Sequence, residues 1–301
     1  MIGAALVVLL AFAFGLAAAR TSLCCVAAVI GAVHDRNSDG LLVLATTAVT
    51  CAGLVLVASM LDPLAPHLPA AAGISIPVVA GAVVLAAGSL VNGACYLGTA
   101  LFVGRGRLDF LWTLAGIALA SHLRWMPWGA TSIGPLRRLS QLPGGAAPYL
   151  IGAAALGVAL ATGALRSTSS ARGAALRGAL GIGVAAGLLE GISPGWTSAA
   201  VFGTADLAMV VTALAFFAGG LVGARIAHTF ALRRFTWRGM VRHLAGGWLM
   251  GTGAAWVPGG NDTLLTWAAP GAAVYGVMAL LLYLGTLALA VTMAPRTPAM
   301  R

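Results

Sequence analysis

Charged residues are scarce in this chain, and lysine is absent from it. Of its 301 residues only 8% are charged, while 60% are hydrophobic. So few charged groups cannot cover the surface of a soluble globule of this size, which excludes that class of protein. The chain also has no nucleotide-binding P-loop and no H-E-x-x-H motif, the marks of an ATPase and of a zinc protease. We therefore predict an all-α integral membrane protein that is not an enzyme.

Cysteine and histidine are placed in a way that gives no sign of a disulfide framework or a metal site. The four cysteines lie in or beside apolar stretches and contain no C-x-x-C pair: Cys24, Cys25, Cys51 and Cys95. The five histidines form no ligand pair at helical spacing. We expect no bound metal, haem or other cofactor.

All of the basic side chains are arginines, and they cluster between the apolar stretches, giving a formal net charge of +10. Basic residues at the ends of membrane spans mark the cytoplasmic side, so we interpret the charge as topology and not as a nucleic-acid-binding surface. Most arginines then fall on one face, whereas Arg124, Arg137 and Arg138 fall on the other. We expect the N-terminus outside the cell and the C-terminus inside.

Four small polar loops interrupt the apolar stretches. They are ARTSLCC at Ala19–Cys25, NGACYLG at Asn92–Gly98, EGISPGW at Glu190–Trp196 and VPGGND at Val257–Asp262. Irregular backbone at membrane depth is tolerated only where protein covers it or where it lines a cavity. Recurrent breaks of this kind are typical of transporters that are built from internal repeats.

Hydropathy over windows of about 18 residues predicts nine spans. They lie near 2–19, 41–60, 76–91, 108–121, 147–165, 178–190, 206–230, 243–256 and 271–293. Four short apolar pieces between them are candidate re-entrant half-helices. Two units of span, half-helix and span occupy residues 1–122, and two occupy 178–301. The connecting segment 123–177, with its lone span, would turn the second half upside down, so we expect an inverted repeat with a central path.

Glycines at intervals of four predict close contacts between helices. Clear pairs are Gly219 with Gly223, and Gly247 with Gly251. Small residues let helix backbones approach each other where lipid supplies no hydrophobic drive. The alternative is that such pairs arise by chance in a glycine-rich chain.

The second loop carries the most specific arrangement of residues. Asn92 and Gly93 break the helix, Cys95 begins the next apolar piece, and Gly98 is expected to keep the first turn of that piece open for close approach. Unpaired N–H groups and the helix dipole at a helix N-terminus attract anions and favour a thiolate. The alternative is that Cys95 is a small buried hydrophobic residue.

The other loops supply further candidates. Cys24 and Cys25 are neighbours whose side chains point about 100° apart on a helix, so at most one is expected to face a central path. Cys51 is expected to pack within a span. Glu190 is expected to accept hydrogen bonds from the adjoining half-helix, or to couple an ion. Asp262 is expected to cap the half-helix that it begins, or to contact substrate.

At these loops the chain resembles the YeeE/YedE family of sulphur-transport membrane proteins, which includes thiosulfate uptake proteins. The resemblance spans nearly the whole length and is clearest in GSLVNGACYLGTALF from Gly88 and GGWLMGTGAAWVPGGND from Gly246. It implies an hourglass-shaped inverted repeat in a bacterial-type cytoplasmic (inner) membrane, in which thiols pass thiosulfate along a central path. Here those thiols would be Cys95 and either Cys24 or Cys25.

The fourth loop departs from the family pattern. Where the family motif is Pro-Gly-Cys-Asn, this chain has Gly260 in the place of the cysteine, followed by Asn261. Glycine still permits the tight turn but removes the thiol donor. The residues expected along the substrate path are therefore Cys95, Cys24, Cys25, Asn92, Gly93, Gly260 and Asn261.

The sequence thus predicts a multi-pass permease that moves a small sulphur-containing anion, above all thiosulfate, toward the cytoplasm. One alternative is a membrane thiol redox relay through Cys24, Cys25 and Cys95. Another is a non-transporting subunit that docks a TusA-like soluble sulphur carrier on its arginine-rich face. The expected partners are the anion and the lipid bilayer, and not nucleic acid.

Overall fold

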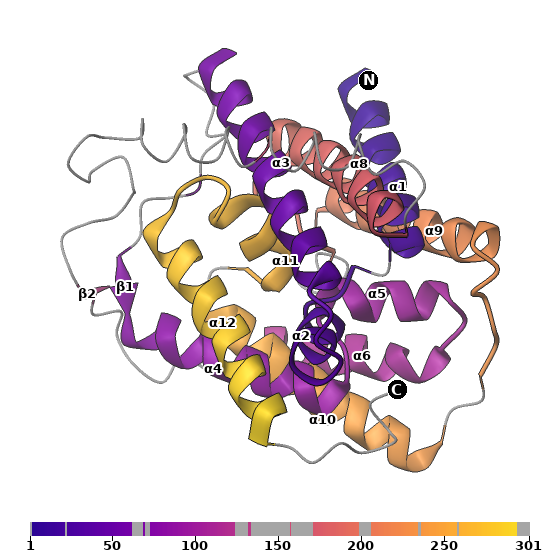
Figure 1. Ribbon diagram of the computed structural model, residues 1–301, viewed down its shortest axis with the longest axis vertical. Coiled ribbons are helices and arrows are strands. Elements are labelled where there is room, and N and C mark those ends of the chain that lie inside the picture. The colour runs from indigo at the N-terminus through magenta and orange to yellow at the C-terminus, as the bar shows by residue number, and fades with distance from the viewer. Residues whose placement is uncertain are drawn as a thin grey trace.

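The computed structural model describes residues 2–21, 23–61, 69, 73–123, 132–133, 157, 171–198, 206–233, 236–257 and 259–293. The elements in the first half of the chain are α1 (Ile2–Thr21), α2 (Cys25–His34), α3 (Asp39–Leu61), β1 (Ile74–Ser75), α4 (Ile76–Asn92), α5 (Tyr96–Gly104), η1 (Leu108–Phe110) and α6 (Leu111–Leu123). They are followed by β2 (Ser132–Ile133), α8 (Ala171–Ile192), α9 (Leu207–Ile226), α10 (Trp237–Trp256), α11 (Asn261–Thr263), the π-helical turn η4 (Leu264–Ala268) and α12 (Val274–Met293) (Figure 1).

Five helical stretches in the described residues are long and apolar enough to cross a membrane. They are Gly3–His34, Ile76–Gly104, Arg172–Ile192, Leu207–Ile226 and Val274–Met293. Large apolar side chains point outward from these stretches: Leu207, Leu289 and Met293 are 73%, 62% and 77% exposed. Such exposure over whole helices suits lipid and not water. The chain is an all-α membrane protein. Its described residues include a short two-stranded antiparallel sheet in which Ile74 pairs with Ile133.

Helices occupy eight of the nine predicted spans. The remaining predicted span, 147–165, lies outside the described residues apart from residue 157. Two of the helices contain only shorter apolar stretches, Asp39–Val55 and Leu108–His122, and α10 carries Arg238 and Arg242 in its first two turns. The number of nine spans and the inverted repeat therefore stay predictions.

Some helices begin earlier in the sequence than the predicted spans. Their first turns are polar, so the hydropathy windows did not include them. The α10 helix begins at Trp237, where the Oγ1 of Thr236 accepts a hydrogen bond from the N–H of Gly239 at 3.1 Å. Helix α8 begins at Ala171 and has Arg172 and Arg177 in its first two turns. Charged side chains lower the mean hydropathy of a window without disfavouring a helix.

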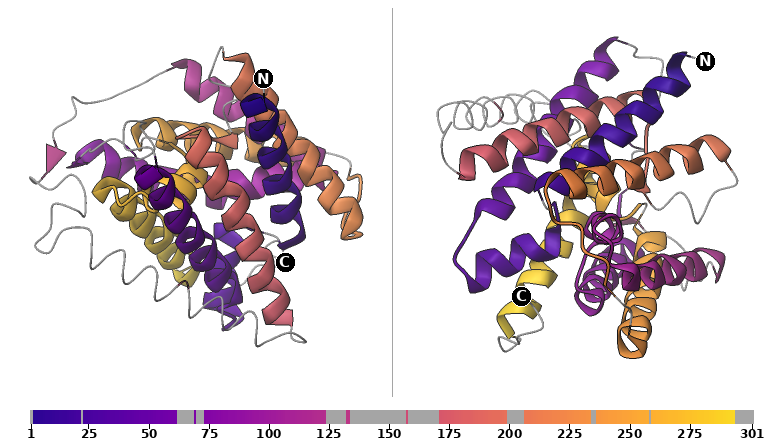
Figure 2. Two further views of the ribbon diagram at one scale, coloured as in Figure 1. Left: turned by 90° about the horizontal axis from the view of Figure 1, so that it is seen from above. Right: turned by 90° about the vertical axis from the view of Figure 1, so that its right-hand side faces the viewer.

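The most extensive helix contacts join the two halves of the chain. Helix α1 packs against α9 and α8, α3 packs against α8, and α10 packs against α4 and α6. Figure 1 shows α1, α3, α8 and α9 gathered in its upper part and α4, α6 and α10 in its lower part, with α2 between them. In the left view of Figure 2, α1 lies between α8 and α9. The core is therefore built between helices from opposite halves.

Glycines allow these helix pairs to touch through their backbones. A Cβ on Gly219 would clash with the carbonyl group of Phe12 in α1, and a Cβ on Gly247 would clash with that of Thr113 in α6. Their partners at intervals of four also lie against a neighbouring helix: Gly223 against α1, and Gly251 against α6. The predicted close packing is confirmed at both pairs.

Candidate functional site

The candidate site begins where α4 ends and α5 begins. Gly93 ends α4 in the left-handed conformation, with a φ of 78° that a side chain would strain. Cys95 is extended and is the N-cap of α5, and its Sγ accepts a hydrogen bond from the N–H of Gly98 at 3.4 Å. The structure thus places a buried thiol at the positive end of a helix of nine residues.

The first break brings two more thiols to the same point. The Sγ of Cys24 lies 3.7 Å from that of Cys95, and the N–H of Cys25 donates to the Cys95 Sγ at 3.4 Å. Gly98 makes this approach possible, because a Cβ there would lie 2.6 Å from the Cys24 Sγ. All three are free thiols, and none is more than 7% exposed. We call Cys24, Cys25 and Cys95 the thiol cluster.

The fourth break meets the thiol cluster through Asn261. Its Oδ1 accepts a hydrogen bond from the N–H of Tyr96 at 2.9 Å, and its Nδ2 donates to the Sγ of Cys25 at 3.5 Å. Tyr96 begins α5 and Cys25 begins α2. The buried side chain of Asn261 therefore links the N-terminus of α5 to the N-terminus of α2.

Gly260 and Cys95 have nearly the same backbone conformation. Their φ and ψ angles are −76° and −177° at Gly260, and −80° and −179° at Cys95, and each is the N-cap of a short helix. Any residue adopts these angles, so the backbone at position 260 accepts a glycine or a cysteine equally well. The positive φ of this turn, 101°, belongs to Gly259. A Cβ on Gly260 would lie 2.6 Å from the Oδ1 of Asp262, so a carboxylate borders the place of the family's thiol.

Glu190 holds the third break in place. Its Oε2 accepts hydrogen bonds from the N–H groups of Gly195, at 2.8 Å, and Trp196, at 3.1 Å. Its Oε1 accepts one from the hydroxyl of Thr266 in η4, at 2.8 Å. The carboxylate therefore pairs two N–H groups within the third break and joins this break to the fourth. The half-helix that Glu190 was expected to contact lies outside the described residues beyond Ser198.

Asp262 does not cap the helix that it begins, contrary to expectation. The N-cap is Gly260, and no side chain caps this helix. The Oδ2 of Asp262 instead accepts hydrogen bonds from the hydroxyls of Thr197 and Ser198, both at 2.8 Å, and from the N–H of Ser198 at 3.0 Å. Three hydrogen bonds from residues that directly follow the third break stabilise this carboxylate more than the single hydrogen bond of an N-cap would. Its buried Oδ1 has no hydrogen-bond partner among the described residues.

The third break also has the spacing G-x-S-x-G, from Gly191 to Gly195. In hydrolases this motif turns from a strand into a helix and presents the serine as a nucleophile at the turn. Here it lies at the C-terminal end of α8. The motif therefore lacks the structural context of a nucleophile.

Asn92 belongs to a chain of buried hydrogen bonds that sequence analysis missed. Its Nδ2 donates to the carbonyl of Ala94 and to the Oγ1 of Thr99, both at 2.9 Å. Its Oδ1 accepts a hydrogen bond from the Oγ1 of Thr113 at 2.6 Å and lies 2.7 Å from the Nδ1 of His243. Asn92 and His243 are 151 residues apart in the sequence, so no local pattern links them.

Two arginines place positive charge beside the breaks. The Nη2 of Arg105 donates to the carbonyl of Ala19 at 3.1 Å, next to the first break. The Nη2 of Arg242 lies 3.8 Å from the point that a Cβ on Gly93 would occupy. Together with the N-terminus of α5, these charges make surroundings that favour an anion.

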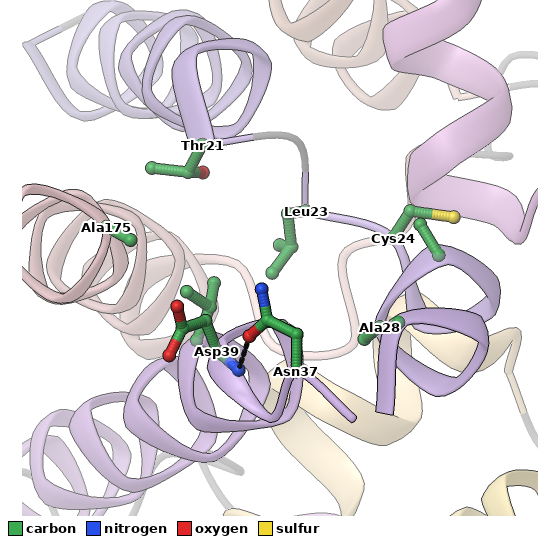
Figure 3. Close-up of a pocket in the computed structure, with 11 residues that line it drawn as sticks. Thr21, Leu23, Cys24, Ala28, Asn37, Asp39 and Ala175 are labelled. Atoms are coloured by element: carbon green, nitrogen blue, oxygen red, sulfur yellow. Dashed lines mark hydrogen bonds between the residues drawn. The ribbon is translucent and has the colours of Figure 1, made fainter. Parts of the chain in front are cut away.

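A cavity of about 250 Å³ lies beside the thiol cluster. Its lining includes Thr21, Cys24 and Asn37 (Figure 3). Figure 3 shows the sulphur of Cys24 directed away from the cavity. That sulphur lies 3.7 Å from the Sγ of Cys95. Of the two adjacent cysteines, Cys24 borders the cavity and Cys25 does not. Cys24 therefore forms the wall between the cavity and Cys95.

Cys51 lies apart from this cluster, and its Sγ donates to the carbonyl of Gly183 at 3.4 Å where α3 packs against α8. This is the packing role that we expected of it. Among the described residues, no group of three or more histidine, cysteine, aspartate or glutamate side chains could hold a metal ion.

The fold and the site define a class: a helical membrane protein in which breaks in the helices surround a buried thiol cluster. No protein-family model matches the chain, and a search of curated proteins finds no match. The resemblance in the loop residues and the geometry of the site are therefore the grounds for a function.

Proposed function

We propose that the chain is a permease that carries a small sulphur-containing anion, thiosulfate first of all, across the cytoplasmic membrane toward the cytoplasm. The observation that carries the proposal is the approach of the Cys24 and Cys95 thiols to 3.7 Å at the N-terminus of α5. Thiols are weak donors that suit a soft terminal sulphur, and helix N–H groups suit negative oxygens. Thiosulfate has both.

The cavity beside Cys24 would hold the anion before or after it passes the thiols. Its volume of about 250 Å³ exceeds several-fold the roughly 30 Å³ that a water molecule occupies in the liquid. Cys24 separates the cavity from Cys95. Passage therefore requires the Cys24 side chain to turn aside, which makes it the gate of the proposed path.

The finer architecture belongs to the same proposal. It comprises nine spans, four re-entrant half-helices, an inverted repeat with an hourglass-like path, and the N-terminus outside. The matching backbone angles of Cys95 and Gly260, each before a short helix, support the repeat. The resemblance to the YeeE/YedE family supports the path, which would be lined by Cys95, Cys24, Cys25, Asn92, Gly93, Gly260 and Asn261.

Uptake of labelled thiosulfate into proteoliposomes, with sulfate as competitor, tests this function. Cys95→Ala should lower the flux by about 10- to 100-fold, the equivalent of one lost hydrogen bond to a charged group. Cys51→Ala is the matched control, because that thiol is also buried and hydrogen-bonded but lies outside the cluster. Full flux in Cys95→Ala would refute the thiol mechanism, and an inactive wild type would refute the permease.

The short distance between the Sγ atoms of Cys24 and Cys95 favours a second candidate function, a thiol redox relay. Two thiols at 3.7 Å need only a small rotation to form a disulfide, which passes two electrons and two protons to an oxidant. A relay would accumulate a Cys24–Cys95 disulfide during turnover, which mass spectrometry detects after alkylation. A permease would sustain thiosulfate flux with every thiol reduced. Partner binding without flux would instead favour the subunit that docks a TusA-like carrier.

A further inference from the structure

A buried histidine connects the Cys95 loop to an acidic residue at the edge of the protein. His243 is fully buried, and its Nδ1 lies 2.7 Å from the Oδ1 of Asn92. Its Nε2 lies 3.0 Å from the Oδ2 of Asp109, whose side chain is 16% exposed. The ring of Phe110 covers the imidazole, with 4.2 Å between ring centroids. The histidine therefore faces an oxygen on both sides and is shielded from solvent.

These contacts determine where hydrogen atoms must lie. The Nδ2 of Asn92 faces the carbonyl of Ala94, and only an N–H can donate to a carbonyl, so Oδ1 is the amide atom that faces the ring. The Nδ1 of His243 must then carry a hydrogen. A second hydrogen must lie between its Nε2 and the carboxylate of Asp109. Because Arg107 also pairs with that carboxylate, at 3.1 Å, we place this hydrogen on the ring as an imidazolium.

The charges around His243 oppose one another. Asp109 favours the charged ring, whereas burial and the guanidinium groups of Arg107 and Arg242 disfavour it. The sequence of α4 has no ionisable side chain, and the one in α6, His122, lies nine residues beyond Thr113. One more charge near the ring would therefore change how readily it holds its second proton.

We propose that the pair of His243 and Asp109 binds a proton that is taken up and released together with the anion at the Cys95 loop. This inference rests on the proposed function. A bound anion adds negative charge beside Asn92 and so favours the imidazolium. Loss of the proton leaves a ring nitrogen facing an oxygen without a hydrogen, which breaks the bond to Asn92 or to Asp109. Anion and proton therefore favour each other's binding, and such linkage is reciprocal.

Asp109 gives the proton a way out of the protein. It lies in η1, between the buried ring and Arg107, and it is partly exposed. Proton exchange with solvent can then pass through its carboxylate, while the Cys95 loop stays covered. His243 is a positioning residue in this scheme, because it acts on the anion through Asn92.

Sealed vesicles that contain a pH-sensitive dye test the coupling, with the membrane potential clamped by potassium and valinomycin. Inward thiosulfate flux should acidify the lumen of wild-type vesicles. The number of protons taken up per thiosulfate should fall at least tenfold in His243→Gln and in Asp109→Asn. It should stay unchanged in His122→Gln, since that histidine is exposed. Wild-type flux without acidification would overturn the inference and leave the permease standing.

A second measurement does not depend on transport. In protein labelled with ¹⁵N-histidine, the His243 resonances, assigned by their loss in His243→Gln, should show both ring nitrogens protonated near neutral pH. Thiosulfate should raise the pH at which one proton is lost. A ring with a single protonated nitrogen throughout about pH 5 to 9 would overturn the inference, even if the vesicles showed no flux and the permease itself had failed.

Discussion

At the scale of single residues, the missing side chain of Gly98 allows the thiols of Cys24 and Cys95 to approach each other. The Sγ of Cys24 occupies the volume that a side chain at position 98 would need. The thiol of Cys95 was predictable, because Asn92 and Gly93 break the helix just before it. An open first turn at Gly98 was predictable too, but the residue that fills the opening was not, because Cys24 belongs to another break.

Substitution of Gly98 by alanine should therefore destabilise the protein. A Cβ would lie 2.6 Å from the Cys24 Sγ, and overpacking of this kind costs about 1–3 kcal/mol. Thermal unfolding in detergent measures the effect. Gly181→Ala is the control, because a Cβ at this position in α8 meets nothing within 4 Å. Equal melting temperatures for the two variants would contradict the crowding.

Glu190 offers a test that separates hydrogen bonding from charge. Glutamine at 190 can still accept from Gly195 and Trp196 through its oxygen and can donate to Thr266, so Glu190→Gln should keep both stability and thiosulfate flux. Glu190→Ala leaves two N–H groups unpaired and should lose about 2–6 kcal/mol, at about 1–3 kcal/mol for each group. Unfolding and uptake assays compare the two variants. Normal stability with abolished flux in Glu190→Gln would point to ion coupling instead.

At the scale of elements, hydropathy located the helices well and their ends less well. Short helices follow the first, second and fourth breaks, where half-helices were predicted: α2, α5 and α11 with η4. For the third half-helix only Thr197 and Ser198 lie within the described residues. The hydropathy windows missed the first residues of α8 and α10, because the first turns of these helices are polar. The side-chain role of Asp262 was also missed, because its donors come from a different break.

The contact between α1 and α9 depends on glycine. Leucine at position 219 would collide with the carbonyl of Phe12 and push the two helices apart, so Gly219→Leu should cost at least the roughly 1–3 kcal/mol of core overpacking. Unfolding by detergent titration measures this loss. Gly285→Leu in α12 should be nearly neutral, since a Cβ there meets nothing within 4 Å. A small effect at 219 would mean that the two helices can separate freely.

At the scale of the whole molecule, the two halves are not separate bodies. Helices α1, α3, α4 and α6 find their main partners among α8, α9 and α10. The sequence predicted an inverted repeat by counting spans, but counting cannot say which spans touch. Pairing across the halves is set by side-chain fit and by glycines that lie far apart in sequence, neither of which leaves a local pattern.

The predicted topology has its own test. With nine spans the termini lie on opposite sides of the membrane, so a fluorescent domain fused to the C-terminus should fold in the cytoplasm. An epitope at the N-terminus should be open to protease added outside intact cells. The segment from 124 to 138 is the strictest test of this topology, because its three arginines are predicted to lie outside the cell, against the positive-inside rule. Termini on one side would show that the number of spans is even.

The pairing of α1 with α9 also affects how the chain is made. Helix α1 ends at Thr21 and α9 begins at Leu207, so roughly 190 residues separate their synthesis, which takes about 10–40 s at about 5–20 residues per second. During that time the face of α1 that packs against the glycines of α9 lacks this partner. A newly made first half must therefore be held by the insertion machinery or by lipid until the ribosome delivers the second, and ribosome-bound chains halted before α9 should be the most sensitive to membrane proteases.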